Sequence, residues 1–226
     1  MDDLVHDLNR RFDHAALHPE VNEQSVVRLC EEAREHQFYS VAVNPAWVPL
    51  ARSELKGSGV RILTVSGFPL GANRMDIKVL EAAEGVEDGA DEIDMVANIG
   101  WLTEGRFVEA EGEIAKVRIN LPHEVVLKVI IEAGKLTEAQ QVEATEAVVN
   151  GGAQYVKTST GFFGGATVEQ VQTLHRAAEG RIKVKASGGI RTAEQCRRLL
   201  AAGAERLGSS ASVAIMHEIT QQAELK

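Results

Sequence analysis

Three lysines interrupt runs of β-branched residues and are the first candidates for chemistry. They are Lys128 in LKVII, Lys157 in VKTST and Lys185 in VKASGG. A lone lysine in a strand usually lies at an edge or points outward, but three in successive runs predict a cluster. Neighbouring ammonium groups and burial both disfavour the charged form, so the pKa of one lysine should fall. A lysine with a lowered pKa can attack a carbonyl carbon and form a Schiff base.

Two carboxylates accompany these lysines. Asp94 lies in the run EIDMV, and Asp13 lies near the N-terminus. Either could balance the lysine charges and move protons during a reaction. Either could equally be a plain salt-bridge partner, and the spacing leaves both interpretations open. His14 and His18 are close to Asp13 in the chain, but no metal-binding or catalytic pattern completes around them.

Glycine-rich turns follow the last three β-branched runs. Backbone N–H groups in such turns, with a helix N-terminus behind them, form an anion site, and barrels often hold phosphate there. Arg191, just after the second of these turns, could add positive charge or simply be solvated. The candidate residues for anion binding are Gly161, Gly188, Gly189, Gly208 and Ser210.

The elements that must position these residues follow a regular order. Short β-branched runs alternate with amphipathic stretches such as 26–36, 142–150 and 193–203, which is typical of βαβ units and a parallel sheet. Eight strands in 226 residues predict the α/β class and a single (β/α)8 TIM barrel over residues 1–226. An open doubly wound sheet is the alternative. The expected strands are 11–15, 40–43, 60–65, 92–97, 124–131, 154–158, 182–186 and 206–210.

A weak internal repeat relates the candidates to these strands. Gly-Ala closes a helix and opens a strand at 89–90, 152–153 and 203–204, and Gly180 fits the same pattern. Glycine suits the end of a helix because it tolerates the left-handed conformation. Five residues after each glycine the chain reaches the carboxyl end of a strand, where barrel active sites lie. The residues at these equivalent positions are Asp94, Lys157, Lys185 and Gly208.

Composition excludes several classes of partner. The net charge is −9 and no basic run occurs, so we expect neither nucleic acid nor an anionic membrane as a partner. Cys30 and Cys196 lie far apart without metal-ligand spacing, which indicates reduced thiols and no metal site. There is no 18-residue apolar run, and the acidic N-terminus lacks the pattern of a signal peptide. We therefore expect a cytoplasmic protein.

Eight ordered motifs give the chain a strong resemblance to the deoxyribose-phosphate aldolase family. The match extends from about residue 11 to residue 216, nearly the whole chain. The motifs are FDHAALHPE, VAVNPAWV, VSGFPLG, DEIDMVANIG, LKVIIEAGKLT, VKTSTGF, VKASGGIRT and RLGSS.

The resemblance implies a class I aldolase on a TIM barrel, with no metal and no organic cofactor. It would reversibly cleave 2-deoxy-D-ribose 5-phosphate to D-glyceraldehyde 3-phosphate and acetaldehyde, in the breakdown of deoxyribonucleosides. The phosphosugar and acetaldehyde would be its small-molecule partners. We also expect a homo-oligomer, either a dimer or a tetramer.

The same resemblance assigns roles by motif. Lys157 looks like the Schiff-base lysine, Lys185 like the neighbour that lowers its pKa, and Asp94 like the proton-relay carboxylate. Lys128 and Asp13 look like supporting residues of the substrate pocket. The glycine-rich candidates named above match the phosphate-binding loops.

Four positions depart from what many relatives have. Ala15 replaces a common Thr, the loop 162–166 is one residue shorter, and Ala211 replaces a Ser. Ala42 stands where some relatives place a Cys close to the pocket. Two other functions stay open: a different Schiff-base or phosphate-binding barrel enzyme, and a binding protein that kept the pocket without catalysis. A requirement for acetaldehyde as the donor separates the first from the aldolase, and borohydride trapping separates the second.

Overall fold

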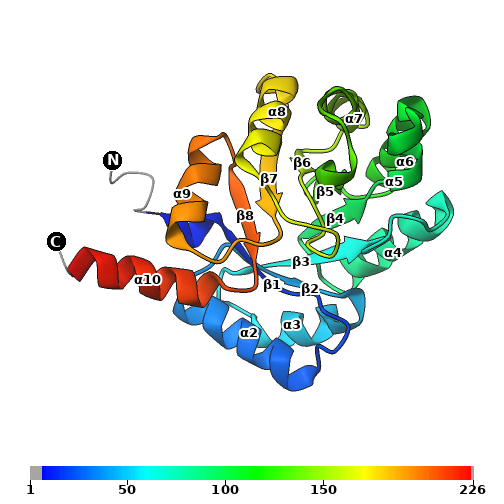
Figure 1. Cartoon of the computed structure of the whole chain (residues 1–226). Helices are drawn as coiled ribbons and strands as arrows, with labels where there is room; N and C mark the ends of the chain where they lie inside the picture. Colours follow the sequence, from blue (N-terminus) through cyan, green and yellow to red (C-terminus); the bar gives the residue numbers. More distant parts are fainter. Residues whose placement is uncertain (1–6, 225–226) are drawn as a thin grey trace.

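Eight parallel strands close into one barrel in chain order, from β1 to β8, with helices on its outside (Figure 1). The computed structural model describes residues 7–224, so residues 1–6, part of the segment used to argue against a signal peptide, lie outside it. The closed barrel confirms the predicted fold and excludes the open sheet. The strands are β1 (Phe12–Ala16), β2 (Ser40–Val43), β3 (Arg61–Ser66), β4 (Glu92–Val96), β5 (Val126–Ile130), β6 (Tyr155–Lys157), β7 (Lys183–Ser187) and β8 (Arg206–Ser209).

Each strand is followed by at least one α-helix that covers the outside of the barrel. The last helix, the red ribbon in Figure 1, starts beside the barrel and its far end projects past the neighbouring helices. Three short 3-10 helices, η1 (Leu8–Arg11), η2 (Pro45–Trp47) and η3 (Ala133–Lys135), complete the described secondary structure. The α-helices are α2 (Glu23–Glu35), α3 (Val48–Glu54), α4 (Met75–Glu87), α5 (Ile99–Glu104), α6 (Phe107–Ile119), α7 (Glu138–Asn150), α8 (Val168–Ala178), α9 (Ala193–Ala201) and α10 (Ser212–Glu224).

A capping box marks the start of three of the described helices. Thr137, Thr167 and Thr192 each accept a hydrogen bond from the backbone of the Gln three residues on, and that Gln side chain accepts one in return. These capping boxes satisfy N–H groups that a helix start leaves unpaired. The cap at Thr137 starts α7 at Glu138, four residues before the predicted 142. The prediction missed this first turn because its residues are polar and show no apolar periodicity.

The predicted glycine repeat is present in the backbone. Gly89, Gly152, Gly180 and Gly203 have φ angles of 113°, 79°, 73° and 112°, all in the left-handed region. Each lies between the end of a helix and the start of the next strand, as the repeat requires. The structure therefore confirms that these glycines turn the chain back toward the barrel.

Strand register sets the level of each inward lysine. Lys157 pairs with Lys185 across β6 and β7, whereas Lys128 pairs with Asp94 across β5 and β4. It is Ile130 of β5 that pairs with Lys157. Lys128 therefore lies two residues before the position of β5 that pairs with Lys157, one inward layer away from the Lys157–Lys185 pair.

Candidate active site

The carboxyl half of the barrel interior brings two lysines onto one carboxylate oxygen. Lys157 Nζ and Lys185 Nζ each lie 2.7 Å from Asp94 Oδ2. All three side chains are buried. Lysine and aspartate are costly in such a place unless they are paired, so this pairing explains how the barrel tolerates them.

A second layer of charge lies around this group. Lys128 Nζ is 3.1 Å from Asp94 Oδ1 and 2.5 Å from Glu92 Oε2. Asp13 Oδ2 is 2.5 Å from Lys185 Nζ, and Arg206 donates a hydrogen bond to Asp13 Oδ1. The network thus links residues of β1, β4, β5, β6, β7 and β8 across the barrel.

Four buried cations and three buried carboxylates make up the interior of this network, and the half-exposed Arg61 reaches Glu92 Oε1 at 3.5 Å from its edge. All seven side chains are buried, and the carboxylates and Lys128 have no exposed area. With every group ionised the set carries one excess positive charge, which a low-dielectric interior opposes. Release of one lysine proton balances it. The members are Asp13, Glu92, Asp94, Lys128, Lys157, Lys185 and Arg206.

The electrostatics favour loss of that proton from the paired lysines. Burial, together with the nearby Lys185 and Lys128 ammonium groups, lowers the pKa of Lys157 to about 8 against the opposing pull of Asp94. The pKa of Lys185 also falls to about 8, again mainly through burial.

Although burial opposes charge on Asp94, the three surrounding lysines hold its pKa far below the usual range. Burial likewise opposes charge on Lys128, but Asp94 and Glu92 raise its pKa. At pH 7 Lys128 is therefore a fixed cation, whereas Lys157 and Lys185 can exchange protons.

A pocket opens above these charges at the carboxyl ends of the strands. It encloses about 580 Å³ of empty space, open solvent at its mouth included. Lys157 and Lys185 line it from below, and residues of the turns after β6, β7 and β8 line one side. The candidate residues that line it are Asp13, Lys157, Lys185, Gly161, Gly188, Gly208 and Ser210.

Not every candidate reaches this pocket. Asp94 and Lys128 belong to the charge network without lining the pocket, and Gly189 is not among the lining residues. Arg191 is exposed and its backbone N–H binds the Gln195 side chain. The structure therefore brings most of the predicted site residues together around one pocket. Lys128 is the exception, because it contacts Asp94 Oδ1 while Lys157 and Lys185 contact Oδ2.

The turns after β6 and β7 approach each other closely. Gly161 and Gly188 both have positive φ angles, 89° and 87°. A Cβ atom on Gly188 would lie 2.8 Å from the Gly164 carbonyl oxygen and 3.0 Å from Gly161 Cα. Only glycine fits this crossing without displacement, and its backbone is left facing the pocket.

Sequence reasoning missed Glu92 and Arg206 as members of the network. Glu92 lies two residues before Asp94, and Arg206 lies two before Gly208. Residues two apart in a strand face the same side, so this spacing would have placed both in the barrel interior. The alternation of inward residues was thus a usable signal for them.

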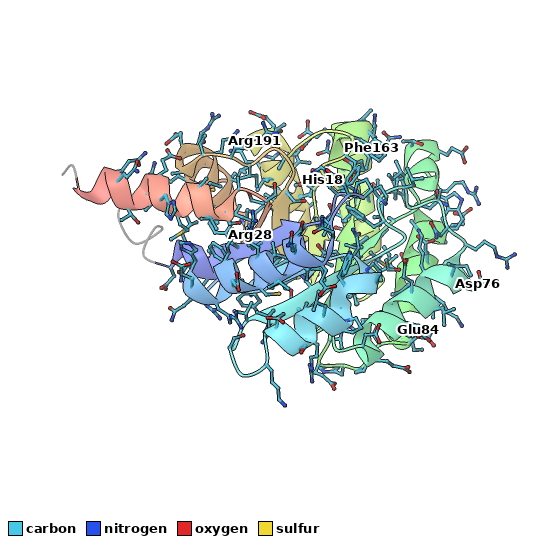
Figure 2. The ribbon with its side chains drawn as sticks, turned by 90° about the horizontal axis from the view of Figure 1, so that it is seen from below. His18, Arg28, Asp76, Glu84, Phe163 and Arg191 are labelled. Atoms are coloured by element: carbon cyan, nitrogen blue, oxygen red, sulfur yellow. The ribbon has the colours of Figure 1, made fainter. Side chains whose placement is uncertain are left out.

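His18 and Phe162 also line the pocket, and no sequence pattern predicted either of them there. Their rings lie 5.6 Å apart, and Phe162 also meets Phe68 edge-on at 5.4 Å. They come from loops after β1, β3 and β6, whose approach depends on barrel closure. Figure 2 shows His18 and Phe163 on the same edge of the molecule.

Both cysteines lie away from this pocket, in helices of the outer ring. Cys30 in α2 and Cys196 in α9 have no exposed area. Burial raises the pKa of Cys30 to about 11 and that of Cys196 to about 12. Both thiols are therefore protonated at neutral pH.

Within residues 7–224, no three His, Cys, Asp or Glu side chains are grouped so that they could hold a metal ion. Nor does that part of the chain contain a helix long and apolar enough to cross a membrane.

Comparisons with known proteins agree with this geometry. A family model described as DeoC/LacD family aldolase matches residues 9–214. The curated deoxyribose-phosphate aldolase of Deinococcus radiodurans is 48% identical over 206 residues, which cover 91% of this chain and 93% of the relative. The one from Thermoanaerobacter is 45% identical over 212 residues, covering 92% of this chain and 95% of the relative.

Solved structures extend the comparison. A structure described as QR15, an aldolase, is 38% identical, has a TM-score of 0.92, and matches 97% of this chain and 99% of its own. Deoxyribose phosphate aldolase from Aeropyrum pernix, described as a tetramer, is 30% identical with a TM-score of 0.86, covering 95% of this chain and 91% of that chain. Mandelate oxidase, at 15% identity and a TM-score of 0.61, shares the fold alone.

Proposed function

Because the chain belongs to the DeoC/LacD aldolase family, we propose that Lys157 is the lysine that forms its Schiff base. The reaction is the reversible cleavage of 2-deoxy-D-ribose 5-phosphate to D-glyceraldehyde 3-phosphate and acetaldehyde. One observation carries the assignment: Lys157 lines the pocket, has a pKa of about 8, and lies 2.7 Å from Asp94. A nucleophile, a carboxylate that moves protons and a second lysine therefore meet where a sugar carbonyl can enter.

The first half of the reaction builds an electron sink. The neutral Lys157 amine attacks C1 of the open-chain sugar, and the resulting carbinolamine loses water to form an iminium ion. Asp94, hydrogen-bonded to Lys157 Nζ, carries the proton that leaves the nitrogen and protonates the departing hydroxyl. Lys185, on the same Asp94 oxygen, supplies or takes up the second proton.

The second half breaks the carbon–carbon bond. The C3 hydroxyl loses its proton, the C2–C3 electron pair moves into the iminium, and glyceraldehyde 3-phosphate leaves. The enamine that remains is protonated at C2, and water releases acetaldehyde and restores the Lys157 amine. The water lost in the first half is regained, so the sum is the cleavage alone.

The other candidates support this chemistry from further away. Lys128, fixed between Asp94 and Glu92, keeps Asp94 ionised, and Asp13 orients Lys185 from the opposite side. The turns at Gly161, Gly188 and Gly208, with Ser210, hold the phosphate, and Gly189 shapes the second of these turns. Binding of a phosphate remote from the breaking bond orients the sugar for reaction.

We further propose a cytoplasmic homo-oligomer, a dimer or a tetramer. Ile77 and Leu80 on α4 are 46% and 55% exposed, and three residues of separation puts them on one helix face. Such an apolar pair favours burial against another copy, and the relative from Aeropyrum pernix is described as tetrameric. Light scattering coupled to size exclusion would give the mass of the assembly, and a monomer would contradict the proposal.

Reductive trapping tests the assignment of Lys157. Acetaldehyde with borohydride should add one reduced two-carbon group to Lys157, located by mass spectrometry of peptides. Lys157→Ala should abolish both the adduct and activity, whereas Lys183→Ala, at an exposed lysine at the start of β7, should change neither. Persistence of the pocket adduct in Lys157→Ala would sink the assignment.

A further inference from the structure

A buried carboxylate that the mechanism above does not use lies two residues beyond β5. Glu132 is 1% exposed, and its backbone has φ 49° and ψ 58°, a left-handed conformation that residues with a Cβ seldom adopt. None of the ion pairs within residues 7–224 includes it. A buried acid held in a strained backbone points to a specific demand on its position.

The Glu132 side chain controls the turn that follows β6. Its Oε2 accepts hydrogen bonds from Thr160 N at 2.9 Å and from Thr160 Oγ1 at 2.7 Å. Thr160 Oγ1 in turn accepts from Phe162 N at 3.1 Å. The chain of bonds from Glu132 through Thr160 to Phe162 therefore fixes both sides of Gly161, and all three turn residues line the pocket.

The backbone on either side of Glu132 has a separate task. Ile131 N donates to Lys157 O at 3.1 Å, and Ala133 N donates to Thr158 O at 2.7 Å. These bonds hold the end of β6, where Lys157 lies, and neither uses the Glu132 side chain. Removal of the carboxylate should therefore loosen the Thr160–Phe162 turn while leaving Lys157 in place.

We propose that Glu132 is a positioning residue for recognition of the substrate phosphate, acting through Thr160. Its carboxylate takes up both hydrogen-bond donors of Thr160, so the turn is held with Gly161 presented to the pocket. This inference rests on the proposed function, because it assigns the turn to the phosphate end of the sugar. Both bonds reach a single oxygen, so an amide oxygen at the same place can still accept both of them.

The test compares Glu132→Leu with Glu132→Gln on two sugars, 2-deoxyribose 5-phosphate and 2-deoxyribose. Glu132→Leu should lower kcat/KM for the phosphorylated sugar about 10- to 100-fold, the loss expected when a charged hydrogen-bond acceptor is removed. This decrease should come mainly from a higher KM. The decrease in kcat/KM for the unphosphorylated sugar should be about threefold or less. Glu132→Gln should restore most of the selectivity, and Lys157 trapping by acetaldehyde should persist in both variants.

A second pair of variants keeps the test open should Glu132→Leu fail to fold. Thr160→Val removes the hydroxyl that links Glu132 to Phe162 and should lower selectivity for the phosphate in the same way. Thr160→Ser should restore it. Equal losses on both sugars, or unchanged selectivity in Thr160→Val, would overturn this inference alone. A wild-type protein that cleaves no sugar phosphate would overturn the proposed function and the inference with it.

Discussion

At the scale of single residues, the reactivity of Lys157 results from opposing effects of its neighbours. Burial and the adjacent lysines favour its neutral form, while Asp94 favours its ammonium form and also serves as its proton partner. The balance leaves a pKa of about 8, so a useful fraction of the amine is free near neutral pH. Substitutions of the two neighbours should therefore move this pKa in opposite directions.

Replacement of Lys185 should shift the pH profile upward. Lys185→Leu removes a cation beside Lys157, which makes the charged form easier to hold and raises the pKa of Lys157. The acid limb of kcat/KM should move on the order of one pH unit higher, and activity at pH 7 should fall about tenfold for this reason alone. Lys183→Leu is the control for loss of a lysine from the same strand. An acid limb that stays near its original pH would show that Lys185 does not perturb Lys157.

Replacement of Asp94 should shift the pH profile downward and should lower kcat more than replacement of Lys185 does. Asp94→Asn removes the carboxylate that raises the pKa of Lys157, so the acid limb should move to lower pH. Loss of the proton relay should lower kcat by about 10²- to 10⁴-fold. The lysines left without their anion should also cost about 3–5 kcal/mol of stability, which thermal unfolding measures. A variant with nearly normal kcat would remove Asp94 from the catalytic group.

At the scale of elements, the number and order of the strands could be predicted, but not how far along the barrel axis each strand is shifted relative to its neighbours. Alternation of β-branched runs with amphipathic stretches predicted all eight strands, and the glycine repeat predicted the turns from a helix to the next strand. What escaped was the vertical offset between strands: Lys128 lies at the level of Asp94 because β5 runs on to pair Ile130 with Lys157. That offset comes from the stagger of a closed barrel, a property of all eight strands together.

The crossing of the turns after β6 and β7 gives an element-scale test. In Gly188→Ala the new methyl would press on the Gly164 carbonyl and on Gly161, and the two turns would have to separate. Strain of this kind costs about 1–3 kcal/mol. We therefore expect KM for the phosphorylated sugar to rise about 5- to 100-fold while trapping at Lys157 is kept.

Gly180→Ala is the matched control for that substitution. Gly180 has a similar positive φ of 73°, but nothing lies within 4 Å of the position where its Cβ would be. It should lose a comparable amount of stability without any change in KM. A Gly188→Ala variant that binds the phosphorylated sugar normally would show that the crossing does not shape the phosphate site.

At the scale of the whole molecule, the sequence identified the family and the barrel, and the structure and the comparisons confirm both. The roles of individual site residues stay predictions, because they came from motifs. Glu92, Arg206 and Glu132 were not among the predicted site residues. Their significance depends on partners more than 25 residues away in the chain, which only closure of the barrel brings into contact.

The placement of thiols in the whole barrel predicts tolerance to acetaldehyde. Its self-condensation yields an unsaturated aldehyde that captures accessible thiolates. Both cysteines are buried in outer helices with raised pKa values, and Ala42 lines the pocket where some relatives have a Cys. Activity should therefore fall only slowly in excess acetaldehyde, and Ala42→Cys should make the loss markedly faster. Rapid inactivation that tracks an adduct on Cys30 or Cys196 would contradict the prediction.

The charges of the barrel interior are divided between its two halves. All three buried carboxylates of the network come from β1 and β4, whereas all four of its buried cations come from β5 to β8. A chain cut between β4 and β5 would thus yield one fragment with an acidic inner face and one with a basic inner face. Two copies of either fragment would bury like charges against each other, which favours association of the unlike pair. The interior charges thereby favour pairing of the two different half-barrels over a tandem duplicate of either one.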